Sequence, residues 1–333
     1  MKAVVWTRYG SPDVLQLREV AKPTPKDNEI LIRVHASTVT AGDCEIRSLK
    51  LPLMLSLPMR AYVGIRRPKR MRILGQEFAG TIESVGKDVS RFQAGDEVFG
   101  MSGFKSGGYA EYMCRPEHPK EMDGVLTAKP PSISFHEAAA ISLGGLESLH
   151  YLRKANIQRG QTVLIIGAGG SIGTLGVQLA KYFGAEVTGV DSAAKLDMLR
   201  SIGADYVIDY TQEDFTESAE VYDAIFDVVG KTPIARAISC LSDTGTYLMA
   251  NPRVSKILRG RFAARGTNKK IVFGNVVYST EQLDYLKSLV DDGELRIVVD
   301  RTYPLEETAE AHRYVETGQK LGNVIITVRV PSE

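Results

Sequence analysis

At 333 residues the chain exceeds the size at which a single hydrophobic core stops growing, so we expect two domains. The apolar fraction of 44% and the charged fraction of 24% are those of soluble globular proteins, which excludes disordered, fibrous and membrane classes. A formal net charge of +1 gives no reason to expect a polyanionic partner such as nucleic acid.

Three cysteines, Cys44, Cys114 and Cys240, are widely spaced and include no CxxC pair. They supply neither a disulfide framework nor a cysteine-rich zinc lobe, so we expect a reducing compartment. The apolar start MKAVVW is too short for a signal-peptide core, and no later stretch has the length of a membrane span. The sequence therefore predicts a cytoplasmic protein without a membrane span.

The first part of the chain has the pattern of short strands. In EILIRVHA the apolar Ile30, Ile32 and Val34 alternate with polar residues, which is the period of a half-buried strand. Between Gly75 and Gly100, short apolar runs such as TIESV and DEVFG are interrupted by glycine and aspartate. This punctuation indicates a compact β-barrel or sandwich.

The pattern changes near residue 130. From Gln161 to Asp300, β-branched runs alternate with helical stretches, as in parallel βαβ units. A further helix, roughly Leu305 to Thr317, and a last strand, NVIITVRV, follow, and this tail could return to the first domain. We therefore predict one domain from residues 1–128 and 301–333, and a second, doubly wound α/β domain from residues 129–300.

Two basic stretches contain no acid, residues 50–72 and residues 253–270. Either can be a solvated surface loop. Alternatively, the first is a lid with an apolar inner side, because LPLMLSLPM lies within it, and the second is a contact for an anion or a membrane surface.

The decisive segment is QTVLIIGAGGSIGTLGVQLAKYFGAEVTGVD. A buried strand, Val163 to Ile166, leads through a glycine-rich turn directly into an amphipathic helix. Glycine is needed where the turn tightens and where the backbone approaches a pyrophosphate, and the helix N-terminus offers that anion unpaired N–H groups. The turn reads AxGxxG over Ala168, Gly170 and Gly173, and Asp191 ends the next strand at the distance that a ribose contact needs. This context predicts a dinucleotide site.

Ligands of open parallel sheets bind beyond the carboxyl ends of the strands, so later strand ends should line the same crevice. Each of those ends can equally be an ordinary strand-to-loop junction. The residues that we expect at the cofactor are Ala168, Gly169, Gly170, Ser171, Ile172, Gly173, Asp191, Ser192, Lys195, Tyr210, Val229, Met249, Ala250, Phe273 and Gly274.

Several motifs in a fixed order resemble the medium-chain dehydrogenase/reductase superfamily, and most of all its zinc-independent quinone oxidoreductase branch. They are STVTAGDCEIR, LGQEFAGTIESVGKDVSRFQAGDEVFG, GGYAEY, the AxGxxG turn, SIGADYVIDY, YDAIFDVVG and YPLEETAEAHRYVETGQKLGNVIITV. The resemblance implies a GroES-like β-barrel domain interrupted in sequence by a Rossmann domain. It also implies a homodimer formed through the Rossmann sheet edge near Ile271 to Tyr278.

Zinc-dependent members of this superfamily carry a ligand cysteine three residues before the aspartate of the first motif, and a ligand histidine in a GHE motif. Here those positions hold Thr40, before Asp43, and Gln76. Hydroxyl and amide oxygens are poor substitutes for thiolate and imidazole, and Glu77 alone does not make a zinc site. We therefore expect no metal.

Without a Lewis acid, conjugate addition of hydride to an enone, enal or quinone is favoured over oxidation of a simple alcohol. The resemblance makes Thr40, Asp43 and Gln76 the candidate catalytic residues, although Thr40 and Gln76 can also be plain cleft lining. Asp43 and Arg47, four residues apart, can also form a structural ion pair. Two alternatives remain open: an alcohol dehydrogenase without zinc, and a dinucleotide-binding protein with a regulatory or nucleic-acid-binding role.

For the cofactor we expect NAD(H), with NADP(H) as the second possibility. An aspartate at position 191 can accept hydrogen bonds from both ribose hydroxyls, and it repels a 2′-phosphate. Lys195 can offset part of that repulsion, so the expected preference for NADH is moderate. The resemblance also places Glu147 where a threonine usually contacts the nicotinamide end, so the family does not identify the substrate. We expect the run Leu51 to Met59 to cover the substrate end of the cleft.

Overall fold

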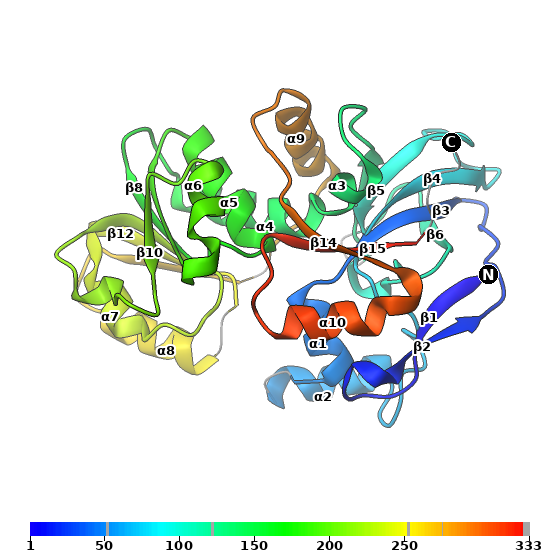
Figure 1. Cartoon of the computed structure of the whole chain (residues 1–333), viewed down its shortest axis with the longest axis horizontal. Coiled ribbons are helices and arrows are strands. Elements are labelled where there is room, and N and C mark those ends of the chain that lie inside the picture. The colour runs from blue at the N-terminus through cyan, green and yellow to red at the C-terminus, as the bar shows by residue number, and fades with distance from the viewer. Residues whose placement is uncertain (51–52, 121–122, 252–253, 275, 329–333) are drawn as a thin grey trace. The chain divides into compact units, whose positions relative to one another are not determined.

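The computed structural model describes residues 1–50, 53–120, 123–251, 254–274 and 276–328. Their contacts form two compact units. The first comprises residues 1–143, 278–291 and 297–333, and the second comprises residues 144–277 and 292–296. Figure 1 shows the elements of both units.

The first unit is built on a mixed sheet with the strand order β14-β15-β3-β4-β5-β7, and β6 also pairs with β3. A separate antiparallel pair, β1 and β2, precedes it in the chain. The strands are β1 (Lys2–Trp6), β2 (Leu15–Glu19), β3 (Glu29–Thr38), β4 (Glu77–Val85), β5 (Glu97–Met101), β6 (Tyr112–Pro116), β7 (Val125–Ala128), β14 (Val299–Pro304) and β15 (Asn323–Thr327).

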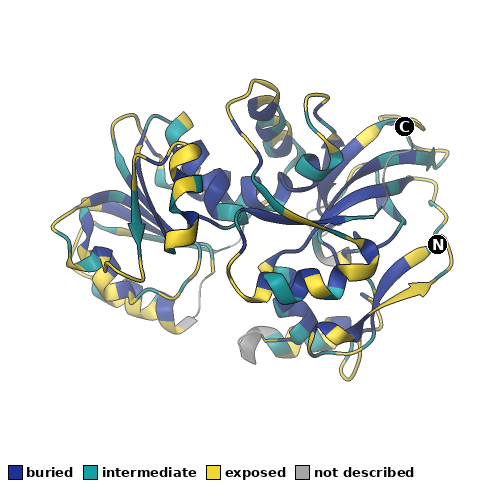
Figure 2. Ribbon diagram, in the orientation of Figure 1, coloured by how far each residue is buried: buried dark blue, intermediate teal, exposed yellow. Residues whose placement is uncertain are grey.

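Strand β3 is at the centre of this sheet and is more buried than its sequence predicts. The alternation of Ile30, Ile32 and Val34 indicates one buried face, yet the polar His35 on the other face is also buried. A helix, α3 (Phe135–Ala139), packs on that face and stacks the ring of Phe135 on His35 with a centroid distance of 4.2 Å. Most of this strand is buried, and only Glu29 and Arg33 are of intermediate exposure (Figure 2). The prediction of a half-buried strand is therefore wrong, because a helix covers the face expected to meet water.

The C-terminal tail returns to the first unit, as predicted. Strand β15 pairs with β3 in antiparallel fashion, with Ile326 opposite Ser37. The helix before it, α10 (Thr308–Glu316), packs against α1 (Ala41–Ser48). The two ends of the sequence are thereby joined in one sheet.

The second unit contains a parallel sheet with the strand order β10-β9-β8-β11-β12-β13. Numbered along the chain, this is the order 3-2-1-4-5-6 of a Rossmann fold. Since such crossovers are right-handed, helices of the two halves cover opposite faces, which makes the sheet doubly wound. The strands are β8 (Thr162–Ile166), β9 (Glu186–Asp191), β10 (Tyr206–Asp209), β11 (Tyr222–Asp227), β12 (Leu241–Met249) and β13 (Lys270–Phe273).

Helices follow most of these strands. They are α5 (Ser171–Tyr182), α6 (Leu196–Ser201), α7 (Ile234–Ser239) and α8 (Val254–Ala263), and α4 (Ser142–Ala155) precedes β8. A further helix, α9 (Thr280–Asp291), packs against β7 of the first unit. Residues 129–143, 278–291 and 297–300, which the sequence analysis assigned to the Rossmann domain, belong to the first compact unit.

The two basic stretches are only partly loops. The first contains α2 (Leu53–Val63), of which Val63 is fully buried, followed by exposed arginines such as Arg66 and Arg67. Leu51 and Pro52 lie outside the described residues, so the predicted lid stays a prediction. The second contains α8, whose Lys256 is buried, so the interpretation as a solvated loop is wrong there. Among the helices that the structure describes, none has the length and apolarity to cross a bilayer.

Candidate functional site

All six strands of the parallel sheet end at the same level. In the pairing register, the last residues of adjacent strands face one another across the whole sheet. These aligned ends are Asp209, Asp191, Ile166 (paired with Val190), Asp227, Met249 and Phe273. The strand order reverses between β8 and β11, and ligands of this fold bind in the crevice at such a switch point.

The turn after β8 lies at this switch point and depends on its glycines. Gly167 has φ +81°, and a Cβ there would lie 2.3 Å from the Val229 side chain, which follows β11. A Cβ on Gly173 would lie 2.3 Å from the Gly167 carbonyl oxygen. Side chains at these two positions would force the turn open. The turn therefore brings the ends of β8 and β11 into direct contact.

The N-terminus of α5 fits an anion. Gly170 is the N-cap residue, and it offers no side chain to the first-turn N–H groups of the helix. A Cβ on Gly170 would meet nothing closer than 3.7 Å, so there is room for a side chain at the N-cap residue. No acidic residue lies in the first turn, which includes Ser171, Ile172 and Gly173. N–H groups at the positive end of a helix dipole, with no acidic side chain beside them, suit the pyrophosphate of a dinucleotide.

Asp191 lies at the edge of this turn, but its carboxylate is already bonded within the protein. Its Oδ2 accepts a hydrogen bond of 2.8 Å from the Gly169 N–H, and its Oδ1 accepts one of 2.9 Å from the Ser192 N–H. The Lys195 ammonium lies 3.1 Å from Oδ1, and both side chains are buried. The Tyr210 N–H bonds the Asp191 carbonyl oxygen. Asp191 thus holds the turn in shape, and its charge is offset by a cation.

The remaining predicted cofactor residues lie on the aligned strand ends. Met249 is buried, and the Ala250 N–H donates to the carbonyl oxygen of Asp227 across the β11–β12 edge. Phe273 ends β13, and the Gly274 carbonyl accepts a hydrogen bond of 3.3 Å from the Tyr151 hydroxyl of α4. Ala168, between the glycines, is fully buried and its N–H bonds the Val190 carbonyl. The structure therefore brings these predicted residues to one edge of one sheet.

Glu147 is on α4, one turn before Tyr151. Burial, together with the charge of Glu147, raises the pKa of the Tyr151 hydroxyl above its usual value. A neutral tyrosine therefore donates to Gly274 at physiological pH.

One functional cluster at this edge was missed by the sequence analysis. Asp227 is fully buried, and its Oδ1 accepts the Gly230 N–H at 2.7 Å. Its Oδ2 accepts the Tyr247 hydroxyl at 2.6 Å and the Lys256 ammonium at 2.7 Å. The carboxylate thus ties the turn that carries Val229 to β12 and α8. The sequence offered one signal for this cluster, because Asp227 is an acidic residue at the end of a buried strand.

In the first unit, Thr40 and Asp43 form a capping box at the start of α1. The Thr40 hydroxyl accepts the Asp43 N–H at 3.0 Å and donates to Asp43 Oδ2 at 2.7 Å. The Thr40 N–H also donates to Oδ2. The hydroxyl proton of Thr40 is therefore committed to Asp43.

Asp43 joins this helix start to the segment before β4. Its carboxylate accepts the N–H groups of Gly75 and Gln76, and its side chain is fully buried. Burial raises the pKa of this carboxyl to about 6, although the hydrogen bonds oppose the shift. Because both oxygens of the buried Asp43 carboxylate already accept hydrogen bonds, this residue positions the Gly75–Gln76 segment.

Gln76 is held by its backbone and not by its side chain. Its carbonyl oxygen accepts the Ser102 N–H at 2.7 Å and the Ser102 hydroxyl at 2.9 Å. Within the described part of the chain, its partly exposed side-chain amide makes no hydrogen bond. A Cβ placed on Gly42 would lie 3.4 Å from Gln76 Oε1 and 3.5 Å from Thr40 Oγ1, so these two predicted site residues lie on either side of Gly42.

Glu77 is buried next to Gln76 and has both oxygens bonded. Thr38 donates its hydroxyl at 2.5 Å and Leu143 donates its N–H at 2.6 Å. Burial raises the pKa of the Glu77 carboxyl to about 7. Among the residues that the structure describes, no three His, Cys, Asp or Glu side chains gather as a metal site would require.

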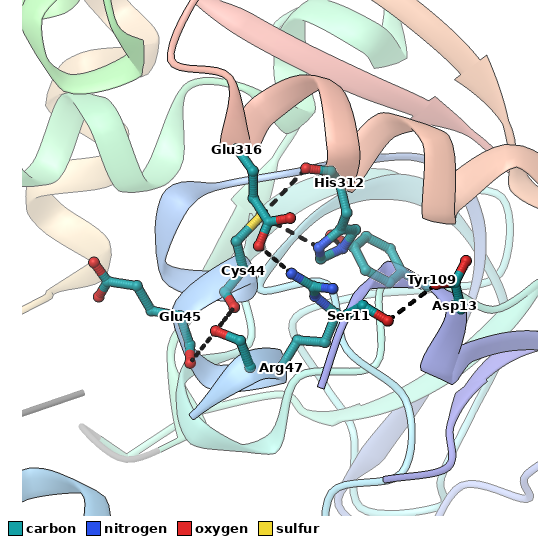
Figure 3. A network of polar contacts seen from close by, with 9 residues as sticks. Ser11, Asp13, Cys44, Glu45, Arg47, Tyr109, His312 and Glu316 are labelled. Atoms are coloured by element: carbon teal, nitrogen blue, oxygen red, sulfur yellow. Dashed lines mark hydrogen bonds and ion pairs between the residues drawn. The ribbon is translucent and has the colours of Figure 1, made fainter. Parts of the chain in front are cut away.

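The expected ion pair between Asp43 and Arg47 does not form. Arg47, which is fully buried, pairs instead with Glu316 of α10. Figure 3 shows this pair beside the contact of Cys44 with His312, whose Sγ and Nδ1 lie 3.3 Å apart. Burial lowers the pKa of His312 to about 3 and raises that of the Cys44 thiol. Neutral imidazole and thiol do not make a nucleophile, so this cluster fastens α1 to α10.

Two family models match the chain. Residues 26–141 match the alcohol dehydrogenase GroES-like domain, and residues 202–326 match a family described as zinc-binding dehydrogenase. The 2-methylene-furan-3-one reductase of Solanum lycopersicum is 32% identical over 98% of this chain and 79% of its own length. The chain belongs to the medium-chain dehydrogenase/reductase superfamily, as a quinone oxidoreductase-like member.

Other members of this superfamily extend the comparison. The chloroplastic NADPH-dependent alkenal/one oxidoreductase of Arabidopsis thaliana is 29% identical over 98% of this chain and 79% of its own length. The structure of the quinone oxidoreductase from Coxiella burnetii superposes on this chain with a TM-score of 0.86 and 31% sequence identity. The superposition covers 99% of each chain. The GroES-like and Rossmann domains that the resemblance implies are therefore those of this superfamily.

Proposed function

We propose that this protein reduces the conjugated double bond of enones, enals or quinones with hydride from a nicotinamide dinucleotide. The observation that carries the proposal is the N-terminus of α5, which has a glycine N-cap and no acidic residue in its first turn, at the switch point of a Rossmann sheet. The names of the similar reductases, which act on a furanone, alkenals or enones, and quinones, support the substrate class.

A reduced nicotinamide supplies the hydride when the dinucleotide is bound. In our proposal, the first turn of α5 binds the pyrophosphate, and Asp227 and Asp191 keep the surrounding turns in place. Hydride adds to the β-carbon of the substrate, the π electrons move to the carbonyl oxygen, and a proton from water completes the α-carbon. The negative charge therefore develops on the substrate oxygen, where a hydrogen-bond donor lowers the barrier.

We assign that donor role to the side-chain amide of Gln76, because its backbone is fixed while its amide makes no other hydrogen bond among the described residues. Thr40 and Asp43 are positioning residues in this proposal. Their capping box holds the Gly75–Gln76 segment against the start of α1.

We also propose that zinc takes no part, although one matching family is described as zinc-binding. The donors at the corresponding positions are a threonine hydroxyl that is bonded to Asp43 and a neutral glutamine amide. Glu77 has both oxygens engaged by Thr38 and Leu143. This donor set does not fit Zn²⁺, which prefers thiolate and imidazole.

For the cofactor, we propose that the protein uses NADH and NADPH with a moderate preference for NADH. The Asp191 carboxylate disfavours a 2′-phosphate, and the Lys195 ammonium 3.1 Å away offsets part of this repulsion. We propose that two copies of the chain form a homodimer through the edge strand β13. We also propose a reducing compartment, the cytoplasm, because all three cysteines are free.

Steady-state turnover tests the proposal. NADH and NADPH oxidation should be measured with a panel of enones and quinones, and with simple aldehydes for comparison. We expect enones and quinones to be reduced, and Gln76→Leu to lower kcat about 100-fold, whereas the exposed Gln93→Leu should leave kcat unchanged. Absence of turnover on every enone and quinone, or equally fast oxidation of simple alcohols, would overturn the proposal.

A further inference from the structure

A second hollow lies entirely within the first unit. It has a volume of about 380 Å³ and is bounded by the end of β2, the segment before β4, the loop after β5 and strand β6. Its apolar wall is formed mainly by Val5, Val20, Pro23, Met71, Ile73 and Met113. Its polar wall carries Arg70, Arg72, Lys105 and Arg115. None of the residues that we expect at the cofactor or in catalysis lines this hollow.

The cations of this hollow have few acidic partners. Lys105 pairs with Asp123 at 2.8 Å, but Arg70 and Arg72 form no salt bridge within the described residues. No aspartate or glutamate is among the described residues that line the hollow. Both arginines come from the basic stretch 50–72, which the dinucleotide chemistry does not use.

The cations without an acidic partner include a buried one, since the side chain of Arg115 is buried. Its guanidinium donates to the carbonyl oxygens of Cys114, at 3.1 Å, and Ser106, while its Nε has no hydrogen-bond partner. The buried hydroxyl of Ser106 also lacks a partner. Burial lowers the pKa of Arg115 to about 10, so it remains charged at neutral pH. A buried cation is ordinarily paired with an anion, but Asp123 and Glu29 act on Arg115 only at longer range, and its hydrogen bonds go to carbonyl oxygens.

We propose that this hollow binds a small amphiphilic oxyanion, an alkyl or aryl phosphate or carboxylate. The anionic group lies by Arg70, Arg72 and Arg115, and the apolar group lies on the wall around Val5 and Met113. A solvated basic loop would explain Arg70 and Arg72 but not the buried charge of Arg115 or the adjoining apolar wall. Arginine suits such a site because its planar guanidinium pairs with phosphate and carboxylate oxygens.

Calorimetric titration of the full chain with hexyl phosphate tests the proposal. We expect a dissociation constant of about 1 mM or tighter, and binding at least about ten-fold weaker for inorganic phosphate or hexanol alone. The double variant Arg70→Gln/Arg72→Gln should weaken hexyl phosphate binding about ten-fold. The control Arg66→Gln/Arg67→Gln removes two exposed arginines of the same stretch outside the hollow, and it should leave binding unchanged.

Three results would overturn the proposal. The first is that hexyl phosphate does not bind at about 5 mM, five-fold above the expected dissociation constant. The second is that both double variants lose the same binding affinity, and the third is that NADH displaces hexyl phosphate. The last result would place the ligand at the dinucleotide site, so it separates this proposal from the proposed function.

Discussion

The Lys195 ammonium lies 3.1 Å from the Asp191 carboxylate at the edge of the glycine-rich turn. The lysine stem also packs beside the turn, since a Cβ on Gly169 would lie 2.4 Å from Lys195 Cδ. The residue expected to reject NADPH is therefore accompanied by a cation that weakens the rejection.

Replacing this lysine should sharpen the cofactor preference. Lys195→Met keeps an apolar stem on Gly169 and removes the charge, so Asp191 repels a 2′-phosphate without compensation. We expect the ratio of kcat/KM for NADH to that for NADPH to rise about ten-fold, which corresponds to about 1.4 kcal/mol. Lys181→Met, which removes a more exposed lysine of the same unit, is the control. An unchanged ratio in Lys195→Met would show that the pair does not face the ribose.

A negative charge at the start of α5 should weaken dinucleotide binding without unfolding the protein. Gly170→Asp places a favourable capping residue at a position with room for it, but its carboxylate meets the N–H groups that we assign to the pyrophosphate. Gly170→Asn has the same size and caps equally well without the charge. By fluorescence titration, we expect NADH to bind at least about ten-fold more weakly to the Asp variant than to the Asn variant. Equal affinities, with melting temperatures intact, would place the pyrophosphate elsewhere.

The Asp227–Lys256 pair should stabilise the second unit far more than a surface pair does. Lys256→Met leaves a buried carboxylate without its cation, and such a loss lowers the free energy of unfolding by about 3–5 kcal/mol. Lys181→Met breaks the more exposed pair with Asp205 and should cost less than about 1 kcal/mol. Urea unfolding of both variants makes the comparison. Similar losses would mean that the Asp227 cluster does not hold the strand ends together.

The sequence predicted the local part of this site and missed its long-range part. The glycine-rich turn was predictable because its glycines lie within one short segment, and a Cβ on Gly167, Gly169 or Gly173 would collide with a neighbouring atom. The contacts of Asp227 with Lys256, and of Asp43 with Gln76, join residues about thirty positions apart. Nothing in either segment alone indicates its partner. For the same reason, the sequence analysis considered an ion pair of Arg47 with Asp43, four residues away, and missed its partner in the structure, Glu316.

Domain limits were hard to place for a related reason. Helix α9 follows the Rossmann strands in sequence, but Asp284 on it accepts a hydrogen bond from Thr127 in the first unit. Amphipathic periodicity predicts that such a helix is buried on one side and not which domain covers it. The limits at 128/129 and 300/301 therefore remain a prediction.

The buried carboxyl of Glu77 should make stability depend on pH. Its pKa is raised from 4.5 to about 7 by burial, so the folded state holds a proton that the unfolded state loses. Stability from this group is fully present below about pH 4.5 and is lost as the pH rises through 7. We expect Glu77→Gln, a neutral isostere, to match the unmodified protein at pH 5 and to exceed it in melting temperature at pH 8.

Glu19→Gln, which changes an exposed carboxylate of the same unit, is the control for this pH series. A Glu77→Gln variant that loses stability at pH 8 would mean that the ionised carboxylate is favourable where it lies.

The central claim concerns the carbon that receives hydride, and single-turnover transfer of deuterium measures it directly. The protein, the dinucleotide deuterated at C4 of the reduced nicotinamide and a small enone such as 4-hexen-3-one are mixed, and the product is analysed by NMR. We predict a saturated ketone with one deuterium on the β-carbon. Deuterium on the carbonyl carbon of an allylic alcohol, or no transfer to any enone or quinone, would contradict the account.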